Sequence, residues 1–289
     1  MPGRNVIPCE VLPETKNLIE TFASELRAAA HSIGTHGMTE EEFKDSALFH
    51  AAIERLRGQQ AASMTTKRAF VADVLNYMKD AGSISSWNST GSRDRHDYEI
   101  RMPSGRVAIV EAKGCLDGNN TNIFVRPPNA DEFVIWSLCQ NPGADPRKNV
   151  WSGIHTRLSA EIIARRELVD GLIVWDMICG TIGRPCPKLA ANPARATDVK
   201  HRSVPPPCLY LFPRTVPNAR SNAKPPMHTL DSVEFLKALH STFKCAAEDV
   251  VEASFEVRMV GTDVERRTVL TRNGVVVESS DWTKLRRAS

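Results

Sequence analysis

The chain has 289 residues, 42% of them hydrophobic and 25% charged, which is an ordinary composition for a globular protein with a substantial core. No apolar stretch approaches the ~20 residues that cross a bilayer, and the N-terminus shows no secretory signal, which argues against membrane and secreted proteins. Seven scattered cysteines without a C-x-x-C pair favour reduced thiols in a cytoplasmic protein, and a net charge of +3 identifies no partner by itself.

The first eighty residues predict helices. Apolar residues recur at helical spacing over 18–33, over 43–56 and over 70–78, and the second of these runs follows a capping-box pattern. We expect the third helix to pack against a sheet. Residues 1–64 are therefore assigned to a helical N-terminal region.

A β-hairpin with charged residues follows these helices. Side chains alternate faces along a strand, so Glu111 and Lys113 share one face of the second strand. If the Pro-Ser-Gly turn is centred on Ser104, Asp97 on the first strand lies directly across from Glu111. A two-residue loop would pair Asp97 with Ala112 instead, so we expect an odd-length loop or a bulge.

Two opposed carboxylates repel each other unless a cation lies between them. Mg²⁺ prefers carboxylate oxygens and pairs readily with phosphate, which suggests phosphodiester hydrolysis with Asp97 and Glu111 as metal ligands. The alternative is a surface hairpin whose charges are coincidental. The apolar run 107–110 favours the catalytic interpretation, because a buried strand that ends in charged residues fits a site better than a solvated hairpin.

The hairpin resembles the core motif of the PD-(D/E)XK nuclease superfamily, which includes most type II restriction endonucleases. Asp97 matches the aspartate of that motif, and Glu111 and Lys113 match its E-x-K triplet. His96 stands where the family pattern has proline. The order of elements extends the resemblance, at lower specificity, to residues 65–215.

This resemblance implies a site that holds one or two Mg²⁺ ions through Asp97, Glu111, the backbone carbonyl of Ala112 and the scissile phosphate. Lys113 would orient or deprotonate the attacking water, or neutralise charge in the transition state. The resemblance also implies an α/β fold of the restriction-endonuclease type, with a mixed central β-sheet flanked by helices.

The elements after the hairpin fit such a fold. Residues 133–138 and the apolar run 171–178 predict buried strands, and 150–166 predicts a helix between them. Strand, strand, helix, strand is the order expected when a crossover helix covers one face of a mixed sheet. We assign 65–228 to the nuclease core.

The last part of this core, 181–228, is rich in proline and basic. It holds ten of the eighteen prolines, and eight basic residues minus the single acid Asp198 give a charge of +7. A rigid basic arm that contacts DNA phosphates is one interpretation, and a solvated linker or partly disordered insertion is the other. The basic residues are Arg184, Lys188, Arg195, Lys200, Arg202, Arg214, Arg220 and Lys224.

The C-terminal part, 229–289, predicts a helix over 233–243 and then strands, with a hairpin at Asn273-Gly274. We expect a small β appendage, packed on the core as one domain, that serves dimerisation or DNA contact.

Four residues of zinc-ligand type occur within thirty positions, but their spacings are long and no close cysteine pair anchors a site. We therefore do not expect a structural zinc. These residues are Cys179, Cys186, His201 and Cys208.

Together with the hairpin residues, the resemblance implies a Mg²⁺-dependent, sequence-specific endonuclease of double-stranded DNA, most simply a type II restriction enzyme. Cutting both strands of a palindrome needs two sites, so we expect a C2 homodimer. The alternatives are a nuclease of repair, recombination or transposition on the same fold, a non-catalytic DNA-binding protein, and an α/β protein unrelated to nucleic acids.

Overall fold

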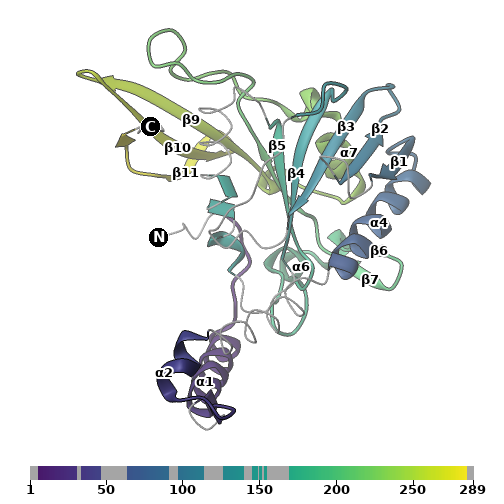
Figure 1. Ribbon diagram of the computed structural model, residues 1–289. Coiled ribbons are helices and arrows are strands. Elements are labelled where there is room, and N and C mark those ends of the chain that lie inside the picture. Colours follow the sequence, from purple (N-terminus) through teal and green to yellow (C-terminus); the bar gives the residue numbers. More distant parts are fainter. Residues whose placement is uncertain are drawn as a thin grey trace.

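A mixed β-sheet of ten strands, flanked by helices, forms the centre of the molecule (Figure 1). The structure is a computed structural model. It describes residues 6–30, 34–46, 64–90, 97–113, 126–139, 145–148, 150–151, 153–154 and 169–284. In these ranges no helix is both long and apolar enough to cross a bilayer. The expectation of an α/β fold with a mixed central sheet is confirmed.

The sheet has the strand order β1-β2-β3-β4-β5-β8-β9-β10-β11, and β12 pairs with β10. Its first three strands are an antiparallel meander, whereas β3, β4 and β5 run parallel. The strands are β1 (Ser86–Ser89), β2 (Tyr98–Arg101), β3 (Val107–Lys113), β4 (Glu132–Cys139), β5 (Gly171–Asp176), β8 (Cys208–Leu211), β9 (Val250–Val260), β10 (Asp263–Arg272), β11 (Val275–Ser279) and β12 (Thr283–Lys284). Two more strands, β6 (Thr197–Val199) and β7 (Arg202–Val204), form a separate hairpin.

Two helices cover one face of the sheet. They are α4 (Met64–Asp80) and α7 (Glu234–Thr242), and their buried residues share one core cluster with β2, β3, β4 and β5. The short α6 (Pro187–Ala191) follows β5, while α1 (Pro13–Ala30) and α2 (Glu40–Asp45) lie apart from the sheet, at the bottom of Figure 1.

Helix α4 follows from its apolar spacing. Phe70, Val74 and Met78 are buried at intervals of four residues, with Val71 beside them, so one stripe faces the sheet. The helix ends before Gly82, whose φ of +71° suits glycine. The prediction that this helix packs against the sheet is confirmed.

The two N-terminal helices agree with their sequence signals where they can be followed. The first occupies most of the expected range. The second begins with the capping box, in which the Thr39 backbone N–H donates to Glu42 at 2.8 Å and the Glu42 N–H donates to the Thr39 hydroxyl at 3.3 Å. The rest of that helix, and most of the helix expected over 150–166, lies outside the described residues.

The basic, proline-rich segment folds onto the core. It contains α6, the β6–β7 hairpin and the central strand β8, and its three consecutive prolines 205–207 are buried. The apolar residues from Cys208 to Leu211 form β8, which is buried. The segment is therefore mainly part of the folded body, and only the loop after β8 has the irregular character expected of an arm.

The C-terminal strands extend the central sheet, where an appendage was expected. They join it because β9 pairs in parallel with β8, with Tyr210 opposite Val251. The expected hairpin at Asn273-Gly274 is confirmed, with φ of +50° and +75° at the two turn residues. The long β9–β10 hairpin projects from one edge of the body (Figure 1).

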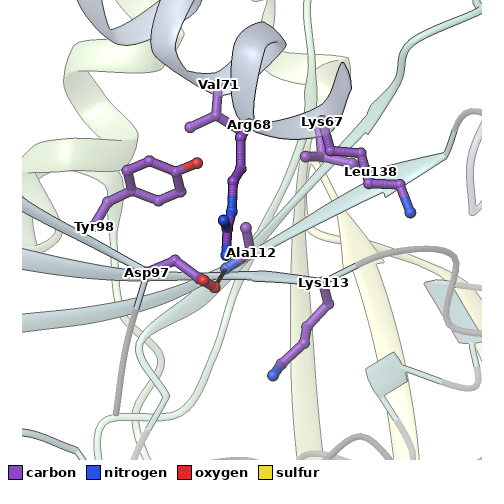
Figure 2. A pocket seen from close by; sticks show the side chains of 8 residues that line it. All are labelled: Lys67, Arg68, Val71, Asp97, Tyr98, Ala112, Lys113 and Leu138. Carbon is purple, nitrogen blue, oxygen red and sulfur yellow. Dashed lines mark hydrogen bonds between the residues drawn. The ribbon is translucent and has the colours of Figure 1, made fainter. Parts of the chain in front are cut away.

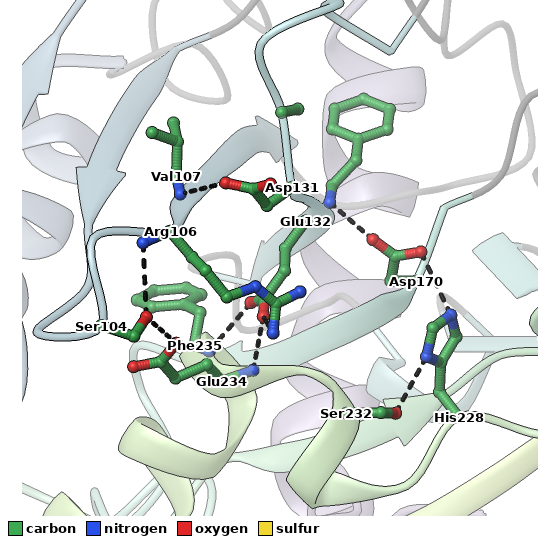
Figure 3. A network of polar contacts seen from close by, with 12 residues as sticks. Ser104, Arg106, Val107, Asp131, Glu132, Asp170, His228, Ser232, Glu234 and Phe235 are labelled. Carbon is green, nitrogen blue, oxygen red and sulfur yellow. Dashed lines mark hydrogen bonds and ion pairs between the residues drawn. The ribbon is translucent and has the colours of Figure 1, made fainter.

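A buried carboxylate ties α7 to the sheet (Figure 3). Glu132, at the start of β4, accepts hydrogen bonds from the backbone N–H groups of Glu234 at 2.6 Å and Phe235 at 2.9 Å. Its Oε1 also lies 3.1 Å from Arg106. Burial raises the pKa of Glu132, and the two N–H groups and Arg106 oppose that effect. This end of the parallel strands is thus fixed by a polar network.

Asp170 forms the second half of this network, just before β5. It accepts a hydrogen bond from the Phe133 N–H at 2.8 Å and is bound by both oxygens to Arg126 at 3.1 Å. His228 contacts the same carboxylate at 3.2 Å and Ser232 at 2.9 Å. These contacts hold the amino ends of β4 and β5 in place, opposite the end at which the charged hairpin residues lie.

Candidate active site

The register of the β2–β3 hairpin is the one that the sequence predicts. Tyr98 pairs with Val110 and Arg101 with Val107, so extending the register places Asp97 opposite Glu111. The turn is of odd length. The Met102 N–H donates to the Arg106 carbonyl at 2.9 Å, and Gly105 in between has a φ of +88°.

Asp97 binds directly to the backbone of the neighbouring strand. It lies one residue before β2, and its Oδ2 accepts a hydrogen bond of 2.9 Å from the N–H of Ala112. Its own backbone N–H donates to the Val110 carbonyl at 3.3 Å. The carboxylate is thereby fixed beside the end of β3 although Asp97 itself lies outside β2.

Glu111 and Lys113 lie side by side on the face of β3 that is turned away from α4. Glu111 is 3% exposed, and its Oε1 forms an ion pair with the Lys113 ammonium. Figure 2 shows Lys113 pointing away from α4. The alternation of faces along β3 explains this, because Ala112 between them packs against the α4 side and the two charged residues point to the opposite side.

A narrow pocket of about 10 Å³, roughly the size of one water molecule, lies where these elements meet (Figure 2). It lies between the first turns of α4 and the ends of β2, β3 and β4. The lining residues are Lys67, Arg68, Val71, Asp97, Tyr98, Ala112, Lys113 and Leu138.

Lys67 and Arg68 are the lining residues that the sequence analysis missed. They precede the buried stripe of α4, which the sequence assigns correctly to the sheet. A basic pair one turn before such a stripe is a weak signal. It becomes informative only when the helix is known to lie over the end of the hairpin.

The pocket environment acts on Tyr98. Burial, and secondarily the charge of Asp97, raise the pKa of the Tyr98 phenol to about 12, while Arg68 opposes the shift. The phenol is therefore neutral at physiological pH. It contributes a polar wall to the pocket and no negative charge.

The donor set suits Mg²⁺. Asp97 and Glu111 supply carboxylates from adjoining elements, and the backbone carbonyl of Ala112 lies between Glu111 and Lys113 in sequence. In the described parts of the chain, no group of three or more His, Cys, Asp or Glu residues could hold a metal. Mg²⁺ is commonly bound by one or two carboxylates together with waters and substrate phosphates, so two carboxylates fit this ion.

Two of the eight basic residues expected to contact DNA are buried. Arg184 is fully buried and ion-paired with Asp176 at the end of β5. Lys188 is 9% exposed, and its ammonium lies 2.8 Å from Asp249. Because both charges are paired with carboxylates inside the fold, we no longer expect these two residues to contact DNA.

The other six are half-buried or exposed, and most have protein partners. Ion pairs join Arg195 to Glu248 at 3.3 Å, Lys200 to Asp73 at 2.5 Å and Lys224 to Glu256 at 2.7 Å. The Arg202 guanidinium lies 5.4 Å from the centre of the Phe70 ring, and Arg214 donates to the Met227 carbonyl at 3.1 Å. Arg220 is exposed in the loop after β8.

The residues of zinc-ligand type do not come together as a set. Cys179, Cys186 and Cys208 are buried, whereas His201 is exposed in the β6–β7 turn. Cys179 lies beside Cys186, and its sulfur is 3.3 Å from that of Cys9, near the N-terminal end of the chain.

No protein-family model, curated protein or solved structure matches the chain. We therefore infer its function from the geometry around Asp97 and the end of β3, and from the motif that these residues resemble.

Proposed function

We propose that the chain is a Mg²⁺-dependent endonuclease that hydrolyses phosphodiester bonds in double-stranded DNA, of the type II restriction kind. The observation that carries this proposal is the contact between the Asp97 carboxylate and the Ala112 N–H, which brings Asp97 next to the Glu111-Ala112-Lys113 triplet. An acid before one strand and an E-x-K triplet at the end of the next are the pattern of the PD-(D/E)XK nucleases.

The chain's own groups have separable roles in this proposal. Asp97, Glu111 and the Ala112 carbonyl would hold the metal and thereby position the scissile phosphate. A bound Mg²⁺ supplies a bound water of lowered pKa and stabilises charge that develops on the phosphoryl oxygens. Lys113 carries its ammonium beside Glu111 and would orient the attacking water or neutralise charge in the transition state.

The surrounding fold supports this assignment. The site lies at the carboxyl end of a buried strand whose neighbour β4 is buried along its whole length. The apolar cluster under α4 and α7 fixes the hairpin from one side. Such rigid support is what a catalytic constellation needs, because small displacements of the reacting groups lower the rate strongly.

A C2 homodimer is part of the proposal. One chain offers one Asp97–Lys113 site, and a palindromic duplex presents two equivalent scissile bonds. Two copies related by a two-fold axis would match that symmetry.

Plasmid cleavage with Mg²⁺ tests the proposal. The native chain would be compared with Asp97→Ala and Lys113→Ala, and with Glu99→Gln as a matched control. Glu99 is a half-buried carboxylate in β2, two residues beyond Asp97, and lies 3.7 Å from Arg101. We expect discrete fragments from the native chain and from the control, and none from the other two variants, provided that all four melt cooperatively.

The outcomes separate the competing functions. Unchanged cleavage by Asp97→Ala or Lys113→Ala would overturn the site. Cleavage without discrete bands would favour a nuclease of repair, recombination or transposition. Binding that is equal with and without Mg²⁺, with no cleavage, would favour a non-catalytic DNA-binding protein. Absence of any salt-dependent DNA binding would point away from nucleic acids.

A further inference from the structure

The pocket beside Asp97 carries more positive charge than the proposed metal chemistry uses. Lys67 and Arg68 line it from α4, whereas the Lys113 side chain points away from α4. Lys113 has a defined partner in Glu111. Arg68 therefore needs an explanation of its own.

Arg68 differs from the other basic residues near the site. It is exposed, and it forms no ion pair or hydrogen bond in the part of the chain that the structure describes. Figure 2 shows its side chain extending from α4 toward the sheet, with the guanidinium end directed at Asp97 and Ala112. Its charge already acts on Tyr98 in the same pocket.

A purely structural role accounts poorly for this placement. An exposed cation near a carboxylate contributes about 0–1 kcal/mol to stability. The basic residues of segment 181–228 show the contrast, because five of them are held by ion pairs within the protein. These are Arg184, Lys188, Arg195, Lys200 and Lys224.

We propose that Arg68 contacts a backbone phosphate of the DNA strand that is cut, and that this strand runs along the protein surface, outside the gap between the first turns of α4 and the end of β3. The inference rests on the proposed function and deepens it by assigning a substrate contact to α4. A guanidinium matches phosphate geometry with two parallel N–H donors, which an ammonium cannot do. Because every nucleotide has the same phosphate, the contact strengthens binding without reading sequence.

Three variants test the contact. Arg68→Ala removes it, Arg68→Lys keeps the charge but not the paired donors, and Lys79→Ala is the matched control. Lys79 is an exposed basic residue in the last turn of the same helix, eleven positions away. Binding to an oligonucleotide duplex would be measured without divalent ions across a range of salt, and plasmid cleavage would be measured with Mg²⁺.

For Arg68→Ala we expect about tenfold weaker binding, equal for related and unrelated sequences, and a salt slope reduced by about one. Arg68→Lys should restore the slope but only part of the affinity. Lys79→Ala should match the native chain. All variants should melt at the native temperature, which a structural role for Arg68 would not predict.

The outcomes distinguish the two proposals. If the native chain cleaves DNA and Arg68→Ala binds and cleaves equally well, the Arg68 contact is wrong and the nuclease proposal stands. If Arg68→Ala melts earlier and its folded fraction binds normally, Arg68 is structural. If the native chain neither binds nor cleaves duplex DNA, the nuclease proposal fails and this contact fails with it.

Discussion

The Asp97 carboxylate accepts a hydrogen bond of 2.9 Å from the backbone N–H of Ala112, so the first residue of the motif is fixed to the middle residue of the triplet. The contact crosses fifteen positions of sequence and closes the charged end of the hairpin. It ties the proposed metal ligand Asp97 to the strand that carries Glu111 through backbone atoms, which are less mobile than two opposed side chains.

Substitution of Asp97 by asparagine separates this structural role from the charge. In Asp97→Asn the amide oxygen can still accept the Ala112 N–H, so we expect a melting temperature close to native. The loss of negative charge should abolish Mg²⁺-dependent cleavage, because an amide is a weaker ligand for a hard cation. Cleavage that persists at the native rate would contradict a metal role for Asp97.

The odd-length turn of the hairpin is a second point at which the site can be tested. Gly105 has a φ of +88°, and a Cβ there would meet no atom within 4 Å. Gly105→Ala should therefore cost about 1–2 kcal/mol through backbone strain alone, with cleavage retained. Urea denaturation and plasmid cleavage measure the two effects.

Deletion of Ser104 should act differently on the same turn. If the turn keeps three residues after the deletion, Met102 faces Val107 and Asp97 moves opposite Ala112, because every pair shifts by one. We then expect cleavage to be lost even where circular dichroism still shows a folded sheet. Native activity in a deletion variant whose pairing has shifted would show that the register does not determine the site.

The hairpin was predictable because its register depends on a short turn and on the alternation of faces. Likewise, the apolar spacing of residues 70–78 was sufficient to assign α4 to the sheet. The approach of Arg68 to Asp97 was not predictable, because it depends on how α4 is rotated and shifted over β2. No local sequence pattern encodes that arrangement.

Non-local pairing explains the other differences. The C-terminal strands are predicted as a small appendage packed on the core, and not as part of its sheet, because nothing local indicates that Tyr210 in β8 pairs with Val251 in β9. The +7 segment is interpreted from sequence as an arm or a solvated linker because its partners, such as Asp73 for Lys200 and Glu256 for Lys224, lie far away in sequence. The net charge of a segment does not include acidic residues from other parts of the chain that pair with it in the fold.

Gly171 at the start of β5 is a position where the core admits no side chain. A Cβ there would lie 2.6 Å from Leu236 Cδ1 and 2.7 Å from the Tyr210 carbonyl oxygen. The leucine can rotate, but the carbonyl belongs to β8, which pairs with β5. Gly171→Ala should therefore destabilise the protein by about 1–3 kcal/mol in urea denaturation.

Gly183→Ala is the control for this substitution, because a Cβ at Gly183 would meet nothing within 4 Å. We expect the control to stay within about 0.5 kcal/mol of the native chain. Equal stability of the two variants would show that β5 and β8 can separate without cost.

Arg184 should behave as a structural residue although it lies in the basic segment. Arg184→Met leaves the buried carboxylate of Asp176 without its guanidinium, which should cost about 3–5 kcal/mol. The double variant with Asp176→Leu should recover part of this loss. A native melting temperature for Arg184→Met would contradict the structural assignment.

Arg220 lies in an exposed loop of the same basic segment. Arg220→Ala should leave stability unchanged, and it should reduce the salt slope of DNA binding by about one if the loop touches phosphate.

Glu132 should make part of the stability depend on pH. Burial raises its pKa above the ordinary value of 4.5, so the folded state holds the proton more tightly than the unfolded chain. The resulting contribution to stability is fully present below pH 4.5 and is lost as the pH rises through the raised pKa. Above that pKa, the ionisation of Glu132 no longer changes the stability with pH. Glu132→Gln cannot titrate, so the difference in free energy of unfolding between native chain and variant should fall above pH 4.5 and then level off.

Glu132→Gln should also be less stable than the native chain at neutral pH, by about 1–3 kcal/mol. A glutamine offers one oxygen where the carboxylate accepts the N–H groups of Glu234 and Phe235 and faces Arg106. Urea denaturation between pH 4 and about 8 measures both effects, with Glu248→Gln as an exposed control. A difference that stays the same at every pH would show that Glu132 does not change its protonation in this range, and α7 would then be held by the hydrogen bonds alone.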